Sequence, residues 1–132
     1  MSSEPQRRAD REVPLFTDPG DVLLSMQAVV GRKWQPVIVY HLLEAGPLGF
    51  SALKDRTGGI SSKMLSESLD DLEAAGLVAR EVVSDKPVRV EYTLTEDGES
   101  LEGLVREMVS WGSRHIDDAA GEEAGLVLEG AR

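Results

Sequence analysis

Hydroxyl and charged side chains gather at the start of one segment, residues 60–76, where they could contact an anion such as a nucleic acid. The segment begins Ile-Ser-Ser-Lys-Met-Leu-Ser-Glu. Small hydroxyls let a helix end approach a phosphate closely, a lysine can bond a phosphate or a guanine edge, and a glutamate can accept from a cytosine amine. The residues of this kind are Ser61, Ser62, Lys63, Ser66 and Glu67.

The same residues also fit a surface helix whose polar face only meets water. Ser61 is a good N-cap in either case, because its hydroxyl can accept from a free backbone N–H of the first turn. Ser62 and Ser66 fit base contacts and solvation about equally well, and Glu67 fits a solvated surface charge somewhat better, so the residues alone leave both interpretations open.

The spacing of the leucines predicts that this segment is a helix over residues 61–75. Leu65, Leu69 and Leu72 recur at intervals of four and three residues, which places them on one apolar stripe. Gly76 stands where helices commonly end in a left-handed residue. A helix with its leucines buried would turn the hydroxyl-rich face outward.

Other kinds of chemistry find no support in the sequence. The chain has no cysteine, which removes disulfides, thiol catalysis and cysteine metal sites. His41 and His115 lie far apart without a companion carboxylate motif, and no nucleophile motif or phosphate-binding loop is present. We therefore expect no enzyme activity, no metal and no cofactor.

Length and composition fit one globular domain in the cytoplasm. The chain has 132 residues and 41% hydrophobic residues, enough for a real core. No apolar run approaches the roughly 18 residues of a membrane span, and the N-terminus has no apolar signal region.

The net charge of −10 is unusual for a nucleic-acid binder, since such proteins are typically basic. Seven of the ten net negative charges follow residue 94, and residues 21–60 carry a net charge of +1. A protein that works at high salt would tolerate this imbalance, because salt screens self-repulsion. Origin from a salt-loving organism is therefore a hypothesis.

The elements before this segment are predicted to be three helices. Residues 1–17 are predicted to be a flexible N-terminal arm. A first helix begins after Asp18, its expected cap, and a second begins near Trp34 or Gln35 and ends at Gly46. A third, short helix is expected after an extended piece, with Ser51 as its cap. The buried side of the first helix is expected to comprise Val22, Leu23, Met26, Val29 and Val30.

The elements after this segment are predicted to be a hairpin and one long helix. Residues 77–83 and 88–94 alternate like strands, with 84–87 as the connecting loop. Thr95 is the expected cap of the long helix, and residues 117–132 are predicted to be an acidic C-terminal tail. The order indicates a mainly α fold with a small β-hairpin, a winged helix-turn-helix with additional N- and C-terminal helices, over residues 18–116.

Four short motifs occur in one order along this framework. They are Gly-Arg-Lys-Trp at 31–34, Gly-Gly-Ile-Ser at 58–61 followed by Met64-Leu65, Leu-Glu-Ala-Ala-Gly-Leu-Val at 72–78, and Val-Glu-Tyr-Thr-Leu-Thr-Glu-Asp-Gly at 90–98. With them, the chain resembles the HxlR-type winged-helix transcription regulators over roughly residues 21–115.

The resemblance implies a homodimer that binds a double-stranded DNA operator. Helix 61–75 would enter the major groove, and the hairpin 84–89 would be the wing. Lys86 and Arg89 flank the hairpin turn, where they would meet the DNA backbone or minor groove, or only solvent. The residues expected at the dimer interface are Leu23, Met26, Leu101, Leu104, Met108 and Trp111.

Three departures from the family's pattern bear on function. The cysteine usual before the first helix is absent, so a thiol-sensing mechanism does not carry over. Gly49 stands where an arginine usually precedes the phenylalanine, and the middle of helix 61–75 carries Ser68, Asp70 and Asp71 rather than basic residues. A protein-interaction module without direct DNA binding is the alternative, and a small-molecule effector stays open without a readable identity.

Overall fold

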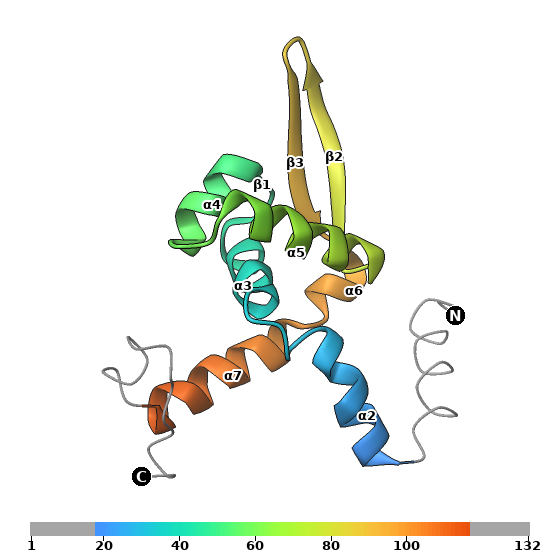
Figure 1. Cartoon of the computed structure of the whole chain (residues 1–132), viewed down its shortest axis with the longest axis vertical. Coiled ribbons are helices and arrows are strands. Elements are labelled where there is room, and N and C mark those ends of the chain that lie inside the picture. Colours follow the sequence, from blue (N-terminus) through green and yellow to red (C-terminus); the bar gives the residue numbers. More distant parts are fainter. Residues whose placement is uncertain (1–17, 117–132) are drawn as a thin grey trace. The chain divides into compact units, whose positions relative to one another are not determined.

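The computed structural model describes residues 18–116, and the chain divides into two compact units between Lys33 and Trp34 (Figure 1). The predicted arm, 1–17, and the predicted tail, 117–132, lie outside the described residues. A single domain over 18–116 therefore stays a prediction, and each unit is described by itself.

The described part of the first unit is a short helical segment. It comprises α2 (Pro19–Ser25) and the 3-10 turn η1 (Met26–Ala28). Asp18 is the cap, as predicted, and its Oδ1 accepts from the N–H of Gly20 at 3.0 Å. The predicted buried side is wrong, because no residue of either element is buried and Leu23 is 67% exposed. Two helical turns have too few side chains to enclose an interior of their own.

Three helices build the core of the second unit. They are α3 (Gln35–Ala45), α4 (Phe50–Thr57) and α5 (Ser62–Ala74). Pro36 is tolerated in the first turn of α3, and Gly46 ends this helix with a φ of 81°. The buried apolar side chains come from these three helices, from the residue before the cap of α5, from the strands and from the C-terminal helix, namely Ile38, Val39, Leu42, Leu53, Ile60, Leu65, Leu69, Leu72, Val78, Tyr92 and Val105.

The start of α4 differs from the prediction. Gly49 holds the cap position and makes no side-chain hydrogen bond, while Ser51, the predicted cap, lies inside the helix. The reason is that Leu48–Gly49 form a short strand, β1, which pairs with β3 at Tyr92 and Glu91. The extended backbone ends at Gly49, so the helix begins at Phe50, two residues earlier than a cap at Ser51 would place it.

The antiparallel sheet has the order β1-β3-β2, and its hairpin projects beyond the helices (Figure 1). Strand β2 is Val78–Asp85 and β3 is Val88–Leu94. The predicted four-residue loop 84–87 is therefore too long, because Ser84 pairs with Arg89 and Asp85 with Val88. The hydroxyl of Ser84 also donates to the carbonyl of Pro87 at 3.0 Å, which closes the tip.

The predicted long C-terminal helix is two helices, α6 (Glu96–Glu99) and α7 (Glu102–His115). Thr95 caps the first, as predicted, and accepts from the N–H of Gly98 at 3.0 Å. Gly98 is buried against the backbone carbonyl of Leu77, which fixes α6 beneath the sheet. This contact joins residues distant in sequence, so helix periodicity did not indicate the break.

Helix α7 packs on α3 through Val105, which is 5% exposed. Arg106 ties the two helices together, with 2.9 Å from Nη2 to Oε2 of Glu44 on α3 and 2.9 Å from Nε to Oε2 of Glu102 on α7. The pKa of Arg106 is raised by its hydrogen bonds to Glu102 and then to Glu44. Both ion pairs are open to solvent, where such pairs contribute little to stability.

Candidate nucleic-acid interface

Helix α5 is held to the core by one side and capped at its start, as the sequence predicted. Its buried residues are Leu65, Ser68, Leu69 and Leu72. The Oγ of Ser61 accepts from the N–H of Met64 at 3.0 Å. Gly58 and Gly59, with φ values of 56° and 112°, turn the chain from α4 into this cap. The first turn of α5 is thereby fixed in place.

All five residues singled out on this helix are exposed, namely Ser61, Ser62, Lys63, Ser66 and Glu67. They follow one another over the first two turns of α5 and on its cap. In helix-turn-helix proteins the N-terminal residues of the second helix contact base edges. The arrangement can therefore present a lysine, a glutamate and small hydroxyls to a groove of duplex DNA.

The middle of α5 has one buried serine and two exposed aspartates. Ser68 is 6% exposed and belongs to the buried side, whereas Asp70 and Asp71 are exposed. Arg80 on β2 lies opposite Tyr92, and its pKa is raised by a hydrogen bond with Tyr92 and, more weakly, by the charges of Glu73 and Asp70. Sequence reasoning missed Arg80, because only the strand register brings it near α5.

Two basic residues of the hairpin, Lys86 and Arg89, lie toward its far end, whereas Arg80 is near its base. Lys86 occupies the turn, Arg89 is opposite Ser84, and both are exposed. Arg89 also lines a surface hollow of about 400 Å³ with the first turn of α4, where Gly49 to Ala52 form the wall beside Val90 and Glu91. Arg89 and the start of α4, which has no side-chain cap, thus line one hollow, and a guanidinium and helix N-terminal N–H groups can each bind a phosphate.

One further exposed residue on α5 was not singled out from the sequence. Met64 is 41% exposed, in the same turn as Lys63. Periodicity assigned Met64 to neither face, because it lies beside the stripe of Leu65, Leu69 and Leu72.

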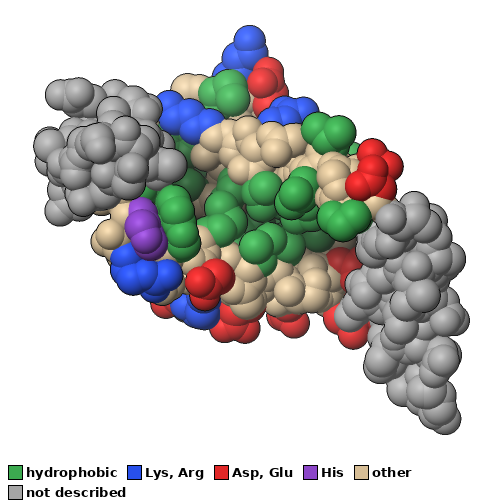
Figure 2. Space-filling model, turned by 90° about the horizontal axis from the view of Figure 1, so that it is seen from below, with side chains coloured by type: hydrophobic (Ala, Val, Ile, Leu, Met, Phe, Trp, Pro, Cys, Tyr) green, Lys and Arg blue, Asp and Glu red, His purple; other side chains and the backbone are tan. Residues whose placement is uncertain are grey.

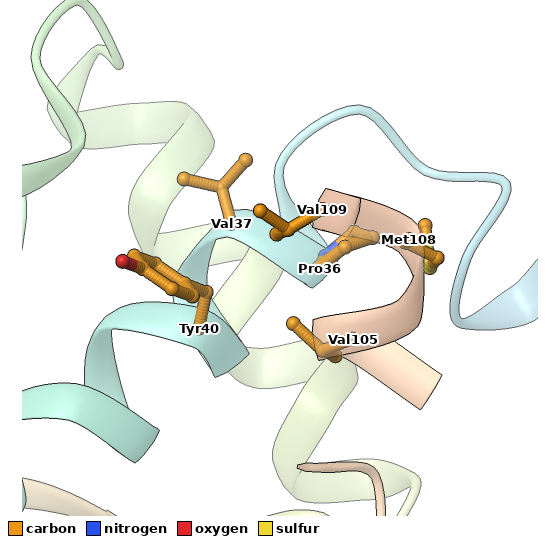
Figure 3. A pocket seen from close by; sticks show the side chains of 6 residues that line it. All are labelled: Pro36, Val37, Tyr40, Val105, Met108 and Val109. Atoms are coloured by element: carbon orange, nitrogen blue, oxygen red, sulfur yellow. The ribbon is translucent and has the colours of Figure 1, made fainter. Parts of the chain in front are cut away.

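The expected dimer residues on α7 form an exposed apolar surface. Leu104, Met108 and Trp111 are 40%, 38% and 42% exposed, and Leu101 is half-buried. Beside them is an apolar hollow of about 250 Å³, lined by Pro36, Val37, Tyr40, Val105, Met108 and Val109 (Figure 3). Figure 2, a view from below, shows hydrophobic side chains exposed at the surface. Leu23 and Met26 belong to the other unit, where Leu23 is exposed and Met26 half-buried.

The two histidines do not come together. His115 stacks on Trp111 with 4.4 Å between ring centroids, and its Nδ1 lies 2.8 Å from the carbonyl oxygen of Trp111. The Nδ1 of His41 is buried without a hydrogen-bond partner, and burial lowers the pKa of His41. Among residues 18–116 no three His, Asp or Glu side chains gather as metal ligands would, and no helix is long and apolar enough to span a membrane.

Comparison with known proteins decides the family. Residues 29–120 match the model of the HxlR-like helix-turn-helix family. The chain belongs to this family. It is 40% identical over 101 residues to the uncharacterized HTH-type transcriptional regulator YtcD of Bacillus subtilis, covering 76% of this chain and 79% of that protein. It is also 38% identical over 90 residues to the regulator YodB of the same organism, covering 68% and 80%.

Solved structures of family members have the same fold. A crystal structure of YtcD aligns with a TM-score of 0.65 at 39% identity, over 70% of this chain and 93% of that one. The redox regulator HypR in its oxidized form aligns with a TM-score of 0.66 at 37% identity, over 74% and 98%. The winged helix-turn-helix predicted from the sequence is confirmed, and the protein is a DNA-binding transcription regulator, as its relatives are.

Proposed function

We propose that the protein acts in the cytoplasm as a homodimer that reads an operator with the start of α5 in the major groove and the β2–β3 hairpin as the wing. The exposure of the five residues at the start of α5, above a buried leucine face, carries this proposal. A two-fold dimer would place two such helices about 34 Å apart, on successive major grooves.

Charge at this surface is supplied by few cations. Lys63, Lys86 and Arg89 are the basic residues we assign to DNA, so a dimer presents six. Each neutralised phosphate contributes a slope of about −0.9 to log K against log salt. The logarithm of the operator-binding constant should therefore fall with the logarithm of the salt concentration, with a slope no steeper than about −5. A much steeper slope would mean that other cations contact the backbone.

The experiment is a fluorescence-anisotropy titration with a duplex selected from a random library on the protein. Lys63→Ala should weaken binding about tenfold or more, because it removes a charge-assisted contact from both half-sites. Arg114→Ala removes the same charge from the exposed end of α7 and serves as the matched control. Equal affinities for the two variants would remove Lys63 from the interface.

A second copy of the chain is the proposed occupant of the α7 surface. Leu101, Leu104, Met108 and Trp111 recur at intervals of three, four and three residues, the spacing of a helix-pairing seam. Leu23 and Met26 of the first unit are assigned to the same interface.

Analytical ultracentrifugation tests this assembly. Leu104→Glu places a carboxylate in the seam and should yield monomers at micromolar concentration, because burying the charge is costly. Ser110→Glu adds the same group on the opposite side of α7 and should leave the dimer intact. A dimer that survives Leu104→Glu would place the interface elsewhere.

A further inference from the structure

An apolar side chain stands among the polar residues at the start of α5. Met64 is 41% exposed, and no other large hydrophobic side chain of this helix is exposed. Lys63 precedes it, and Ser66 and Glu67 follow on the next turn, all exposed. Single exposed apolar residues are common on protein surfaces, so the position and chemistry of Met64 must carry the argument.

Met64 is fixed at the start of α5, the part of the helix that contacts the bases under the proposed function. It is the third residue of the helix, and its N–H donates to the Oγ of Ser61 at 3.0 Å. The cap therefore holds its Cα in the same turn as Ser62 and Lys63. The side chain is long and unbranched, with rotatable bonds that let it follow the surface of a groove.

The chemistry of this side chain selects one feature of DNA. In the major groove a thymine differs from the other bases by its C5-methyl group, which apolar side chains contact. The serines, lysine and glutamate of α5 offer only hydrogen-bonding or charged groups. We propose that Met64 is a specificity-determining residue that recognises the methyl group of one thymine in each half-site.

This inference rests on the proposed function, because it requires the start of α5 to lie in the major groove. Excluding water from one methyl group gives a factor of about four in affinity. A thymine recognised in both half-sites of a dimer then contributes a factor of roughly fifteen. The exposed polar residues at the start of α5 would not distinguish thymine from uracil, which lacks only the methyl group.

The test uses the full chain and a duplex selected from a random library on it. Each thymine is replaced in turn by deoxyuridine, and the dissociation constant is measured by fluorescence anisotropy. We expect one thymine position in each half-site to respond: a single replacement there should weaken wild-type binding about fourfold and should have no effect on the binding of Met64→Ala. Met64→Leu should keep the discrimination, because leucine retains an apolar side chain of similar volume.

Lys63→Ala is the second control, and it should bind more weakly while still distinguishing thymine from uracil. Thermal melts confirm that each variant is folded, as expected for an exposed position. If deoxyuridine is tolerated at every position, Met64 does not contact a methyl group. The same follows if the replacement weakens the binding of Met64→Ala by the same factor as that of wild type. If no duplex is selected at all, the proposed function fails together with this inference.

Discussion

The hydroxyl of Thr95 donates to the backbone carbonyl of Gly76 at 2.6 Å, which ties the end of the wing to the end of the recognition helix α5. The same Oγ1 accepts from the N–H of Gly98 and caps α6. The N–H of Thr95 donates to the carbonyl of Leu77 at 3.0 Å. One threonine thereby joins the exit of α5, the base of the hairpin and the start of α6.

Replacing this threonine should destabilise the fold measurably. We expect Thr95→Ala to lower the free energy of unfolding by about 1–2 kcal/mol, because it removes a helix cap and a second hydrogen bond. Thr95→Ser keeps the hydroxyl and should stay within about 0.5 kcal/mol of wild type. Urea denaturation measures the free energy of unfolding of both variants. Equal losses in Thr95→Ala and Thr95→Ser would show that the hydroxyl does not contribute to stability.

Gly98 should tolerate no side chain. A Cβ there would overlap the backbone carbonyl oxygen of Leu77 and lie 3.0 Å from Cδ2 of Leu94. We expect Gly98→Ala to cost about 2–3 kcal/mol, as overpacking against backbone does.

The matched control for Gly98 is Gly103 on α7, where a Cβ would meet open space. Gly103→Ala should raise the free energy of unfolding by about 0.5 kcal/mol, because alanine loses less conformational entropy in a helix. Urea denaturation compares the two, and a Gly98→Ala variant as stable as wild type would contradict the packing described here.

These contacts show which parts of the fold the sequence predicted and why. Helix α5 was predicted correctly because its cap, leucine stripe and terminal glycine are local signals. The break between α6 and α7 was missed because it depends on Gly98 packing under Leu77, twenty-one residues earlier in the chain. The start of α4 was misplaced for the same reason, since the pairing of Leu48 with Tyr92 sets where the extended backbone ends.

The candidate site was predictable to a similar extent. Periodicity placed the five polar residues of α5 on the exposed face, but it assigned Met64 to neither face. Arg80 could not be found from sequence, because its contact with Tyr92 follows from the register of β2 and β3. The exposed apolar residues of α7 were singled out because their spacing repeats along the helix, and a second copy of the chain as their partner stays a proposal.

The pH dependence of stability should include a contribution from His41. Burial, and then the charge of Arg56, lower the pKa of His41 below 6.5, against a smaller opposing effect of Glu44. The folded protein therefore keeps this imidazole neutral at a pH where the unfolded chain binds a proton. Stability from this group is complete above pH 6.5 and falls as the pH is lowered through 6.5 toward the folded-state pKa.

Urea denaturation at pH 7 and pH 5 isolates this contribution when wild type is compared with His41→Gln. The carboxylates titrate in both proteins, so their contributions cancel in the difference. We expect wild type to lose more stability than the variant on going to pH 5. Identical losses would show that the buried Nδ1 of His41 does not resist protonation.

The acidic balance of the chain should appear as a dependence of stability on salt. Glu81 and Glu91 lie directly opposite each other on β2 and β3. Like charges in such a cross-strand pair repel, and Glu81→Gln should raise the free energy of unfolding by roughly 0.2–1 kcal/mol at low salt. The gain should vanish near 1 M KCl, where the Debye length is about 3 Å.

Glu107→Gln removes the same charge from the exposed face of α7 and is the control. Thermal melts of wild type from 0.1 to roughly 3 M KCl extend the test to the whole chain, since screening reduces the self-repulsion of the acidic protein. The melting temperature should rise with salt. A melting temperature that does not depend on salt would contradict the hypothesis of a high-salt environment.

The most direct test of the central claim asks where the start of α5 lies on DNA. Because the chain has no cysteine, Ser62→Cys introduces a single thiol that can carry a DNA-cleaving iron chelate. On the selected duplex we expect cleavage at two positions about 10 base pairs apart, one for each recognition helix. The same chelate attached to Ser110→Cys on α7 should cleave the duplex at neither of these two positions. Cleavage from α7 and none from α5 would contradict the account.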